Sequence, residues 1–418
     1  MSNKFRLLSG GKIDRTEKIS FKFNGKLLFG FKGDTLASAL LSNGVHLVGR
    51  SFKYHRPRGF LGSGSEEPNA IVQVLKDESR TEPNIRATQI EIFDGFKAKS
   101  QNCWPSVNFD IGEINNFFSP LLPAGFYYKT FMWPAKLWET YEYFIRKSAG
   151  LGVSATQRDP DLYDHKYYHC DVLIVGTGPA GLSAASIAAK SGKKILLVDE
   201  KPDHGGSLIG SDPELTNINK ATPKEWIKET YLNLMKNRNV KVLNRTSVAA
   251  YHNYNYLIMM QNLTDHLNEN EKKNKVRQRL WKVRAKKVIL ATGSIERTMV
   301  FDCNDRPGIM LSSAVRIYLN HYAVKCGNNV VIFANNDDAY ETALSLHKKG
   351  IKIEAIIDIR EGSQGDLVKK CDDLGLKILW KHTVVSAGGR KKINKVFVMK
   401  LSNKNNSVIG NIIKIDCD

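Results

Sequence analysis

The chain has 418 residues and a mass of 47.0 kDa, which at roughly 150 residues per domain predicts two or three domains. Hydrophobic residues make up 42% and charged residues 25% of the chain, a composition that excludes general disorder. The formal net charge is +20, from 62 Lys and Arg against 42 Asp and Glu. Because these basic residues are spread along the whole chain, we interpret them as a solvated surface and expect no nucleic-acid partner.

The sequence gives no sign of export or of a membrane span. It lacks an apolar run of the roughly 18 residues that a span requires, and the first residues contain no stretch suited to a signal peptide. The six cysteines are too few for a disulfide scaffold, and none are spaced C-x-x-C. We therefore expect reduced thiols, a cytoplasmic protein and no contact with a membrane.

Residues 1–100 contain short strand-like runs joined by Gly and Asn turns, with one short helical pattern after Asp34, and they predict a small α+β domain. Residues 101–168 hold sixteen of the chain's 39 aromatic residues. Two interpretations of this aromatic segment stay open. The rings fill a seam between domains, or they form an interface to another subunit.

Residues 169–418 have α/β texture, because apolar, β-branched runs alternate with helical patterns. Such alternation predicts a parallel sheet with right-handed crossovers. We expect a first Rossmann-type unit at 169–300 that closes with a strand at 405–418. A second, degenerate unit is expected at 326–385.

The second unit lacks a working nucleotide fingerprint. Ala334, Asn336 and Ala339 stand where that fingerprint has glycines. A side chain at Asn336 would obstruct a pyrophosphate on the backbone. We therefore expect this unit to be structural.

The motif that carries chemistry is the G-x-G-x-x-G that follows the strand-like run ending at Val175. Gly176 allows the tight turn, Gly178 lets the backbone approach a pyrophosphate, and Gly181 lets the following helix pack on the strand. The N-terminus of that helix then faces the phosphates. This pattern predicts a bound dinucleotide.

Three further pieces agree with this interpretation. Glu200 ends the second strand, at the position where a carboxylate accepts hydrogen bonds from the ribose hydroxyls of a dinucleotide. Asp199 is the other candidate for this role. The positive charge of Lys201, next to Glu200, would reduce the repulsion between that carboxylate and a 2′-phosphate. A Gly-Gly-Ser loop at 205–207 follows it. The strand at 286–290 closes with Ala-Thr-Gly at 291–293.

Long stretches at 49–70, 101–134 and 279–324 resemble the alpha subunit of heterotetrameric sarcosine oxidase, and the degenerate second unit resembles it too. The resemblance implies an N-terminal domain similar to the β-grasp fold of [2Fe–2S] ferredoxins. It also implies a two-dinucleotide-binding, FAD/NAD(P)-linked reductase-like region that binds NAD in its first unit. The folate-binding C-terminal region of that subunit has no counterpart in these residues.

The resemblance further implies a flavoprotein complex with beta, gamma and delta subunits. Such a complex oxidises the secondary amine sarcosine to glycine, releases hydrogen peroxide and passes a one-carbon unit to tetrahydrofolate. Substrate oxidation belongs to the beta subunit, and an FMN lies at the interface with it. We expect this chain to be inactive alone, with the aromatic stretch Phe126–Phe144 as part of that shared interface.

The motif and the resemblance together place the dinucleotide on Gly176, Gly178, Pro179, Ala180, Gly181, Glu200, Lys201, Gly206, Ser207, Val248, Thr292 and Gly293. They assign no catalytic residue and no metal ligand. Because the first cysteine, Cys103, lies beyond residues 1–100, we expect no iron–sulfur cluster.

Two alternatives remain. One is the large subunit of an FAD-dependent amine, opine or proline dehydrogenase, with FAD in the first unit in place of NAD. The other is a non-catalytic scaffold whose nucleotide is structural.

Overall fold

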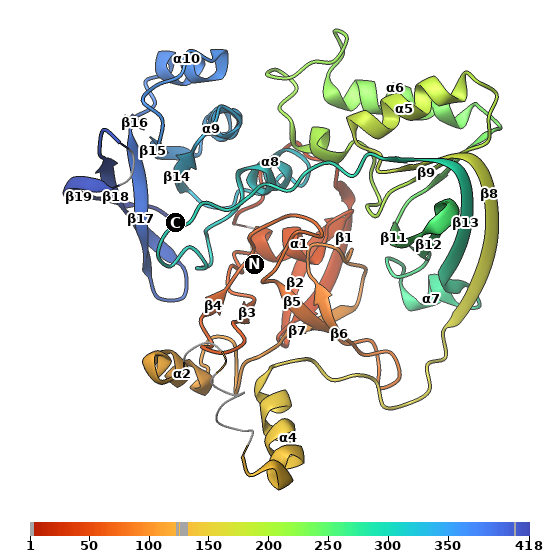
Figure 1. Cartoon of the computed structure of the whole chain (residues 1–418), viewed down its shortest axis with the longest axis horizontal. Coiled ribbons are helices and arrows are strands. Elements are labelled where there is room, and N and C mark those ends of the chain that lie inside the picture. Colours follow the sequence, from red (N-terminus) through yellow and green to blue (C-terminus); the bar gives the residue numbers. More distant parts are fainter. Residues whose placement is uncertain (1–3, 123–124, 126–132, 405–406) are drawn as a thin grey trace. The chain divides into compact units, whose positions relative to one another are not determined.

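The computed structural model of the chain describes residues 4–122, 125, 133–404 and 407–418 (Figure 1). The chain divides into two compact units. Unit 1 comprises Met1–Asp159, Arg297–Tyr318 and Ala323–Asp418, whereas unit 2 comprises Pro160–Glu296 and Leu319–Tyr322. None of the described helices has the length and apolarity that crossing a bilayer requires.

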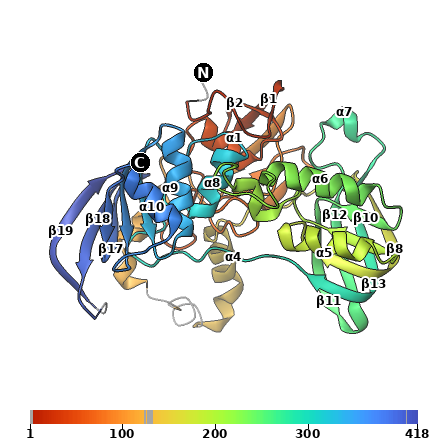
Figure 2. The same ribbon diagram turned by 90° about the horizontal axis from the view of Figure 1, so that it is seen from above.

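The N-terminal part of unit 1 is a five-stranded mixed sheet with one helix against it (Figure 2). The strand order is β2-β1-β7-β5-β6; β1 and β7 are parallel and the other neighbours are antiparallel. The elements are β1 (Asp14–Phe23), β2 (Lys26–Lys32), α1 (Leu36–Ser42), β5 (Ile71–Val74), β6 (Glu82–Arg86) and β7 (Phe96–Ser100), with a small ladder of β3 (Gly49–Arg50) and β4 (Pro57–Arg58). This is the predicted α+β domain.

Helix α1 is held by buried polar contacts as well as by apolar packing. All seven of its residues are buried, and the Thr35 side chain caps its first turn by accepting from the Ser38 N–H. The Arg6 guanidinium donates to both carboxylate oxygens of Asp34, at 3.0 and 2.6 Å. Since both side chains are buried, this two-point pair stabilises the chain at the start of the helix.

The loop at 59–70 is organised by one buried carboxylate. Glu67 Oε2 accepts from the backbone N–H groups of Leu61 and Gly62, each at 2.7 Å. Its Oε1 accepts from those of Asn69 and Ala70, at 2.7 and 3.1 Å. Burial raises the pKa of Glu67, and the four N–H donors oppose that shift. The loop therefore carries its own internal anion.

The segment between this domain and unit 2 is mostly short helical pieces. They are η1 (Ile111–Glu113), α2 (Ile114–Phe117), η2 (Ser119–Leu121), η3 (Ala135–Leu137) and α4 (Trp138–Ser148). Phe117 is 82% exposed and Trp133 is 81% exposed. Part of the predicted interface stretch Phe126–Phe144, at 126–132, lies outside the described residues.

The C-terminal part of unit 1 contains the predicted second α/β unit. A parallel sheet of β14 (Asn329–Ala334), β15 (Lys352–Asp358) and β16 (Ile378–Trp380) accompanies α9 (Asp338–Lys348) and α10 (Asp366–Asp373). An antiparallel sheet of β17 (His382–Gly389), β18 (Ile393–Leu401) and β19 (Val408–Asp416) follows. Helix α8 (Ser312–Asn320) precedes them.

The prediction that residues 405–418 close the first nucleotide-binding unit is wrong. Strand β19 pairs antiparallel with β18, and residues 323–418 belong to unit 1. The connection from β18 to β19 is short, and short connections favour pairing between consecutive strands. Strand β12 pairs with β13 only as far as Arg284. Among the described residues, no strand pairs with residues 285–290 of β13 on the side away from β8.

Unit 2 contains a six-stranded sheet of order β10-β9-β8-β13-β12-β11. Strands β8 (Leu162–Val175), β9 (Ile195–Val198), β10 (Val240–Leu243) and β13 (Val276–Leu290) are parallel; β12 (Tyr256–Asn262) and β11 (Thr246–His252) continue antiparallel. The remaining elements are α5 (Pro179–Ala189), η4 (Gly206–Gly210), α6 (Pro223–Met235), η5 (Asn253–Asn255) and α7 (Glu269–Lys272). Helices α5 and α6 lie together along the parallel strands (Figure 1).

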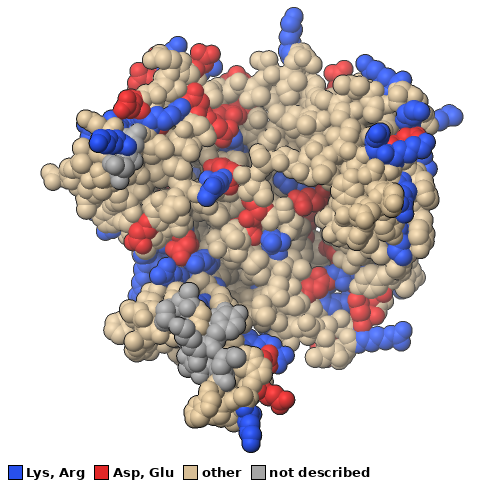
Figure 3. All heavy atoms as spheres, viewed as in Figure 1, with Lys and Arg blue, Asp and Glu red and all other residues tan. Residues whose placement is uncertain are grey.

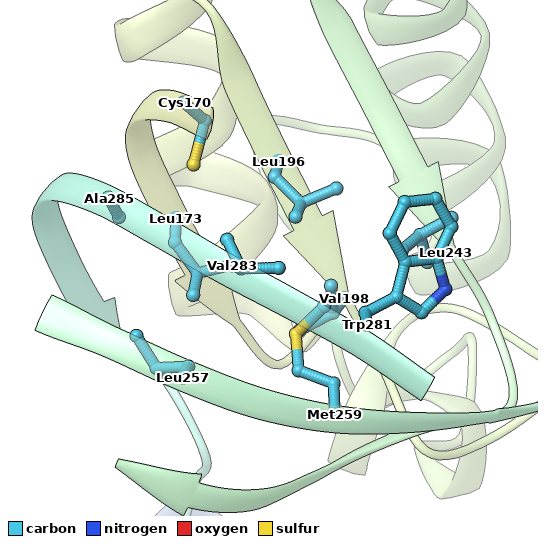
Figure 4. Close-up of a cluster of buried hydrophobic side chains, with 10 residues drawn as sticks. All are labelled: Cys170, Leu173, Leu196, Val198, Leu243, Leu257, Met259, Trp281, Val283 and Ala285. Atoms are coloured by element: carbon cyan, nitrogen blue, oxygen red, sulfur yellow. The ribbon is translucent and has the colours of Figure 1, made fainter. Parts of the chain in front are cut away.

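Strand β9 is buried on both faces, and neighbouring residues of β8 and β9 enter different cores. Ile174 packs with Leu182 of α5 and Leu234 of α6. Its neighbour Leu173 packs on the other face, in a cluster that β12 and β13 complete (Figure 4). That cluster consists of Cys170, Leu173, Leu196, Val198, Leu243, Leu257, Met259, Trp281, Val283 and Ala285. One face of the parallel strands therefore packs against α5 and α6, and the other face packs against side chains of β12 and β13.

On the face shown in Figure 3, Lys and Arg are scattered among Asp and Glu. In β13, burial alternates from Leu280 to Lys286, so that basic residues lie on the more exposed face of this part of the strand.

We predict that Glu67→Gln lowers the free energy of unfolding by about 2 kcal/mol, because the new amide nitrogen would face two N–H donors without an acceptor. Glu66→Gln is the matched control. Glu66 uses Oε1 alone to accept from Ser63 and Gly64, and a glutamine retains that oxygen. Chemical denaturation of both variants measures the difference, and equal stabilities would contradict the prediction.

Candidate dinucleotide-binding site

The glycine loop joins the end of β8 to the start of α5, and two of its glycines are required by the chain's own packing. Gly176 has φ +104°, and a Cβ there would lie 2.3 Å from the Ala291 carbonyl oxygen. A Cβ on Gly181 would lie 1.9 Å from the Gly176 carbonyl oxygen. These positions bring the loop, the helix and the end of β13 into backbone contact.

Gly178 differs from both. The nearest atom to a Cβ on Gly178 is the Gly206 Cα at 3.8 Å, which is ordinary van der Waals distance. The protein itself therefore does not demand a glycine here. Gly178 is also the N-cap of α5 and offers no side chain to the N–H groups of the first turn. The space and the donors fit a pyrophosphate, which a side chain at this position would displace.

Asp199 and Glu200, the two rivals for the ribose, have different roles. Asp199 Oδ2 accepts from the Thr177 N–H and from the Thr177 hydroxyl, both at 2.6 Å. Its Oδ1 accepts from the Lys201 N–H at 2.9 Å. Asp199 is thus engaged in fixing the glycine loop, whereas the adjacent Glu200 is exposed.

The second loop, at 205–207, touches the first. The Gly205 N–H donates to the Thr177 carbonyl at 2.9 Å. Gly206 has φ +55°, and a Cβ there would lie 2.7 Å from the Gly178 Cα. The structure therefore places Gly206 and Ser207 beside the opening at Gly178.

The chain also contains supports for this loop that the sequence did not reveal. The His204 ring stacks on Tyr231, with centroids 4.2 Å apart. Asn244 Nδ2 donates to the Pro202 carbonyl at 2.7 Å. Tyr231 and Asn244 lie 27 and 40 residues after His204 in the sequence. No local pattern could have identified them.

The Ala-Thr-Gly turn and Val248 come next to the same region through backbone contacts. The Ala291 N–H donates to the Val175 carbonyl at 2.8 Å, and Thr292 and Gly293 after it are exposed. Val248 is half-buried against the core on β11. Its strand begins at Thr246, whose N–H donates to the Asp199 carbonyl at 2.7 Å. The predicted residues thus come from five separate segments of unit 2: the glycine loop with the start of α5, the end of β9, the loop at 205–207, strand β11 and the Ala-Thr-Gly turn.

The corresponding edge of the second unit is filled by its own side chains. Arg360 donates from Nη2 to Asp358 Oδ2 and from Nη1 to Asp337 Oδ1, both at 2.7 Å. Tyr340 Oη donates to Asp358 at 2.8 Å. Asn336 accepts from the Asp338 N–H at the start of α9. This network occupies the ends of β14 and β15 with protein charge.

The thiols in the described structure are free, and most of them are buried. Burial raises the pKa of Cys170 to about 11 and the pKa values of Cys326, Cys371 and Cys417 to about 12. These groups are therefore protonated at neutral pH and are poor nucleophiles. No group of His, Cys, Asp and Glu suited to holding a metal ion occurs among the described residues.

Comparison with protein families assigns most of this region. A family model described as "Pyridine nucleotide-disulphide oxidoreductase" matches residues 173–400, which is more than half of the chain. The chain belongs to this oxidoreductase family. The predicted nucleotide-binding, Rossmann-type fold class is thereby confirmed.

The relatives are similar over nearly the whole chain. The sarcosine oxidase subunit alpha of Rhizobium meliloti (strain 1021) is 44% identical over 94% of this chain. The subunit of the same name from Corynebacterium sp. (strain U-96) is 32% identical over 98%. The chain spans only 39% and 37% of their respective lengths. The predicted resemblance to this subunit is therefore confirmed.

A solved structure shares the fold. The L-proline dehydrogenase from P. horikoshii superposes with a TM-score of 0.61 at 19% identity. The match covers 100% of this chain and 61% of that one.

The prediction of no iron–sulfur cluster is contradicted. A family model described as "2Fe-2S iron-sulfur cluster binding domain" matches residues 16–103. This match also confirms the ferredoxin-like fold of the N-terminal domain. The matched range contains one cysteine, Cys103, whereas a ferredoxin cluster of this type has four cysteine ligands.

We predict that Gly178→Val abolishes dinucleotide binding while unit 2 still folds, because the new side chain fills space that the protein leaves open. Losing the phosphate contacts should weaken binding by at least about a hundredfold. Nucleotide content after purification and far-UV circular dichroism measure the two effects. Nucleotide at wild-type occupancy in this variant would contradict the placement of the site.

Two control variants sharpen this test. Ser183→Val changes an exposed position of the same helix and should keep the nucleotide. Gly176→Val should instead destabilise the fold, because its Cβ collides with the Ala291 carbonyl oxygen.

Proposed function

We propose that the first nucleotide-binding unit holds NAD and that the chain is the NAD-binding portion of an alpha subunit in a sarcosine-oxidising complex. The observation that carries the assignment of a dinucleotide is the room for a Cβ at Gly178, a glycine that the chain's own packing does not explain. The similarity to two subunits named sarcosine oxidase subunit alpha supports the substrate class.

In this proposal, backbone N–H groups bind the pyrophosphate of NAD and a side chain binds its adenosine ribose. The N–H groups of Ala180 and Gly181 at the start of α5 donate to the pyrophosphate. Glu200 accepts from the adenosine ribose hydroxyls, and Asp199 keeps the loop in shape through Thr177. Bound NAD supplies hydride-transfer chemistry at its nicotinamide ring.

The oxidation of sarcosine itself is proposed to occur elsewhere in the complex. The glycine loop is surrounded by backbone groups and by the engaged Asp199, and no acid–base pair accompanies it among the described residues. We therefore assign amine oxidation, peroxide release and one-carbon transfer to the assembled enzyme, with further subunits as partners. This chain would contribute the dinucleotide site and a docking surface.

The aromatic segment is the proposed docking surface. Its described rings Trp104, Phe109 and Phe117 are 69, 68 and 82% exposed, so they do not contribute to the core of unit 1. Exposed aromatic groups of this density are typical of the centres of protein interfaces. We therefore favour the interface interpretation over the seam-filling one.

We predict that the chain prefers NAD to NADP by at least about tenfold, since the Glu200 carboxylate binds the hydroxyls and repels a 2′-phosphate. Glu200→Ala should weaken NAD binding and bring the two affinities together. Glu229→Ala on α6 removes the same charge from an exposed position and should change neither affinity. Calorimetric titration of both nucleotides measures this, and equal wild-type affinities would refute the role of Glu200.

We predict that the isolated chain releases no hydrogen peroxide from sarcosine and that co-expression with a beta subunit is required for activity. Peroxide is measured with a coupled peroxidase assay, and the nucleotide released on denaturation is identified by mass spectrometry. Robust peroxide from the isolated chain, or FAD as the released nucleotide, would favour the FAD-dehydrogenase alternative.

A further inference from the structure

Four basic side chains of unit 2 gather around two aromatic rings, Tyr168 and Trp281. We call this group the cation cluster; it consists of Lys166, Lys194, Lys241 and Arg279. The four residues come from β8, the start of β9, β10 and β13, so the group exists only in the folded sheet.

The distances show how closely each charge approaches the ring pair. The ring centroids of Tyr168 and Trp281 are 6.1 Å apart. The Lys241 Nζ lies 5.1 Å from the first centroid and 4.6 Å from the second. Lys194 Nζ is 4.2 Å from Tyr168, Lys166 Nζ is 6.0 Å from Trp281, and Arg279 Cζ is 5.7 Å from Trp281. All four cations are therefore held within about 6 Å of the same ring pair, the range of a cation–π contact.

Only one of the four charges is neutralised within the protein. Arg279 donates through Nε and Nη2 to the two carboxylate oxygens of Asp164, at 2.7 and 2.8 Å. None of the ion pairs in the described part of the chain involves Lys166, Lys194 or Lys241. Burial, followed by the charges of the other three members, lowers the pKa of Lys241. The positive charges of the other members thus oppose the charged form of Lys241, and Asp164 is shared between Arg279 and, at longer range, Lys166.

The cluster lies away from the candidate dinucleotide site. Lys194 immediately precedes β9, and Lys241 is the second residue of β10. The glycine loop and Glu200 instead follow the last residues of β8 and β9. The cation cluster therefore lies toward the N-terminal ends of the parallel strands, and the candidate dinucleotide site lies at their C-terminal ends. Substitutions can change one site without touching the other.

We propose that the cation cluster is a docking site for an acidic protein segment, whose carboxylates neutralise Lys166, Lys194 and Lys241. This inference goes beyond the proposed function and does not depend on the identity of the nucleotide.

The chemistry of the cluster favours carboxylates of a protein over a bound phosphate. Its one guanidinium, the group suited to two-point phosphate recognition, is already engaged with Asp164. The Trp281 ring is only 2% exposed, so it offers no face on which a nucleotide base could stack. What remains is three ammonium groups distributed over the width of several strands. Point charges spaced in this way match several carboxylates along a chain rather than a single compact anion.

The test uses the full chain and a fluorescein-labelled oligoglutamate peptide as the probe, with binding followed by fluorescence anisotropy at low salt. The triple variant K166Q/K194Q/K241Q should weaken binding by about tenfold. The matched control is K224Q/K228Q/K236Q, which removes the same charge from exposed positions in and just after α6. It should change affinity by less than about twofold. Retention of bound nucleotide by both variants checks that unit 2 is intact.

Three results would overturn the proposal. Absence of peptide binding to the wild-type chain at low salt is the first. Equal weakening by the two triple variants is the second, because it would mean that only net charge matters. The third is displacement of the peptide by inorganic pyrophosphate that itself binds the wild type but not the cluster variant, which would make this a phosphate site. Peptide binding that weakens with salt in the wild type, and much less in the cluster variant, supports it.

Discussion

The nucleotide-binding unit depends on the close approach of backbone to backbone around Gly176. The end of β13 passes so near this residue that a Cβ would lie 2.3 Å from the Ala291 carbonyl oxygen, and α5 packs as tightly on it through Gly181. Asp199 fixes the same turn from the next strand by accepting both donors of Thr177. These contacts determine the turn next to Gly178, where a Cβ would meet no atom closer than 3.8 Å. Such preorganisation reduces the conformational entropy lost on binding.

Three polar loops of this chain satisfy their donors or charges in different ways. In the β-grasp domain, four N–H groups converge on the chain's own Glu67. In the second α/β unit, Arg360 joins Asp337 and Asp358 at the edge where a nucleotide would bind. The glycine loop has no such side chain at the N-terminus of α5. The contrast explains why we assign a ligand to this loop alone.

The net charge of +20 does not show how the basic side chains are arranged on the protein. On the face shown in Figure 3, basic side chains lie among acidic ones. In the cation cluster, by contrast, four basic groups lie within about 6 Å of the Tyr168 and Trp281 rings. A uniform basic surface would attract anions without specificity, whereas a fixed cluster selects a partner by the spacing of its charges.

The sequence by itself determined the α+β and Rossmann-type domains, the glycine loop and the second unit's lack of glycines, because these depend on local periodicity and on residue types at fixed spacing. It did not determine the partner of the last strand: β19 pairs with β18, and strand pairing is a non-local choice. Nor could it separate Asp199 from Glu200, since adjacent carboxylates differ only in what the fold places beside them. The supports Tyr231 and Asn244 and the cation cluster came from the tertiary structure alone, because their members are distant in the chain and meet only when the sheet forms.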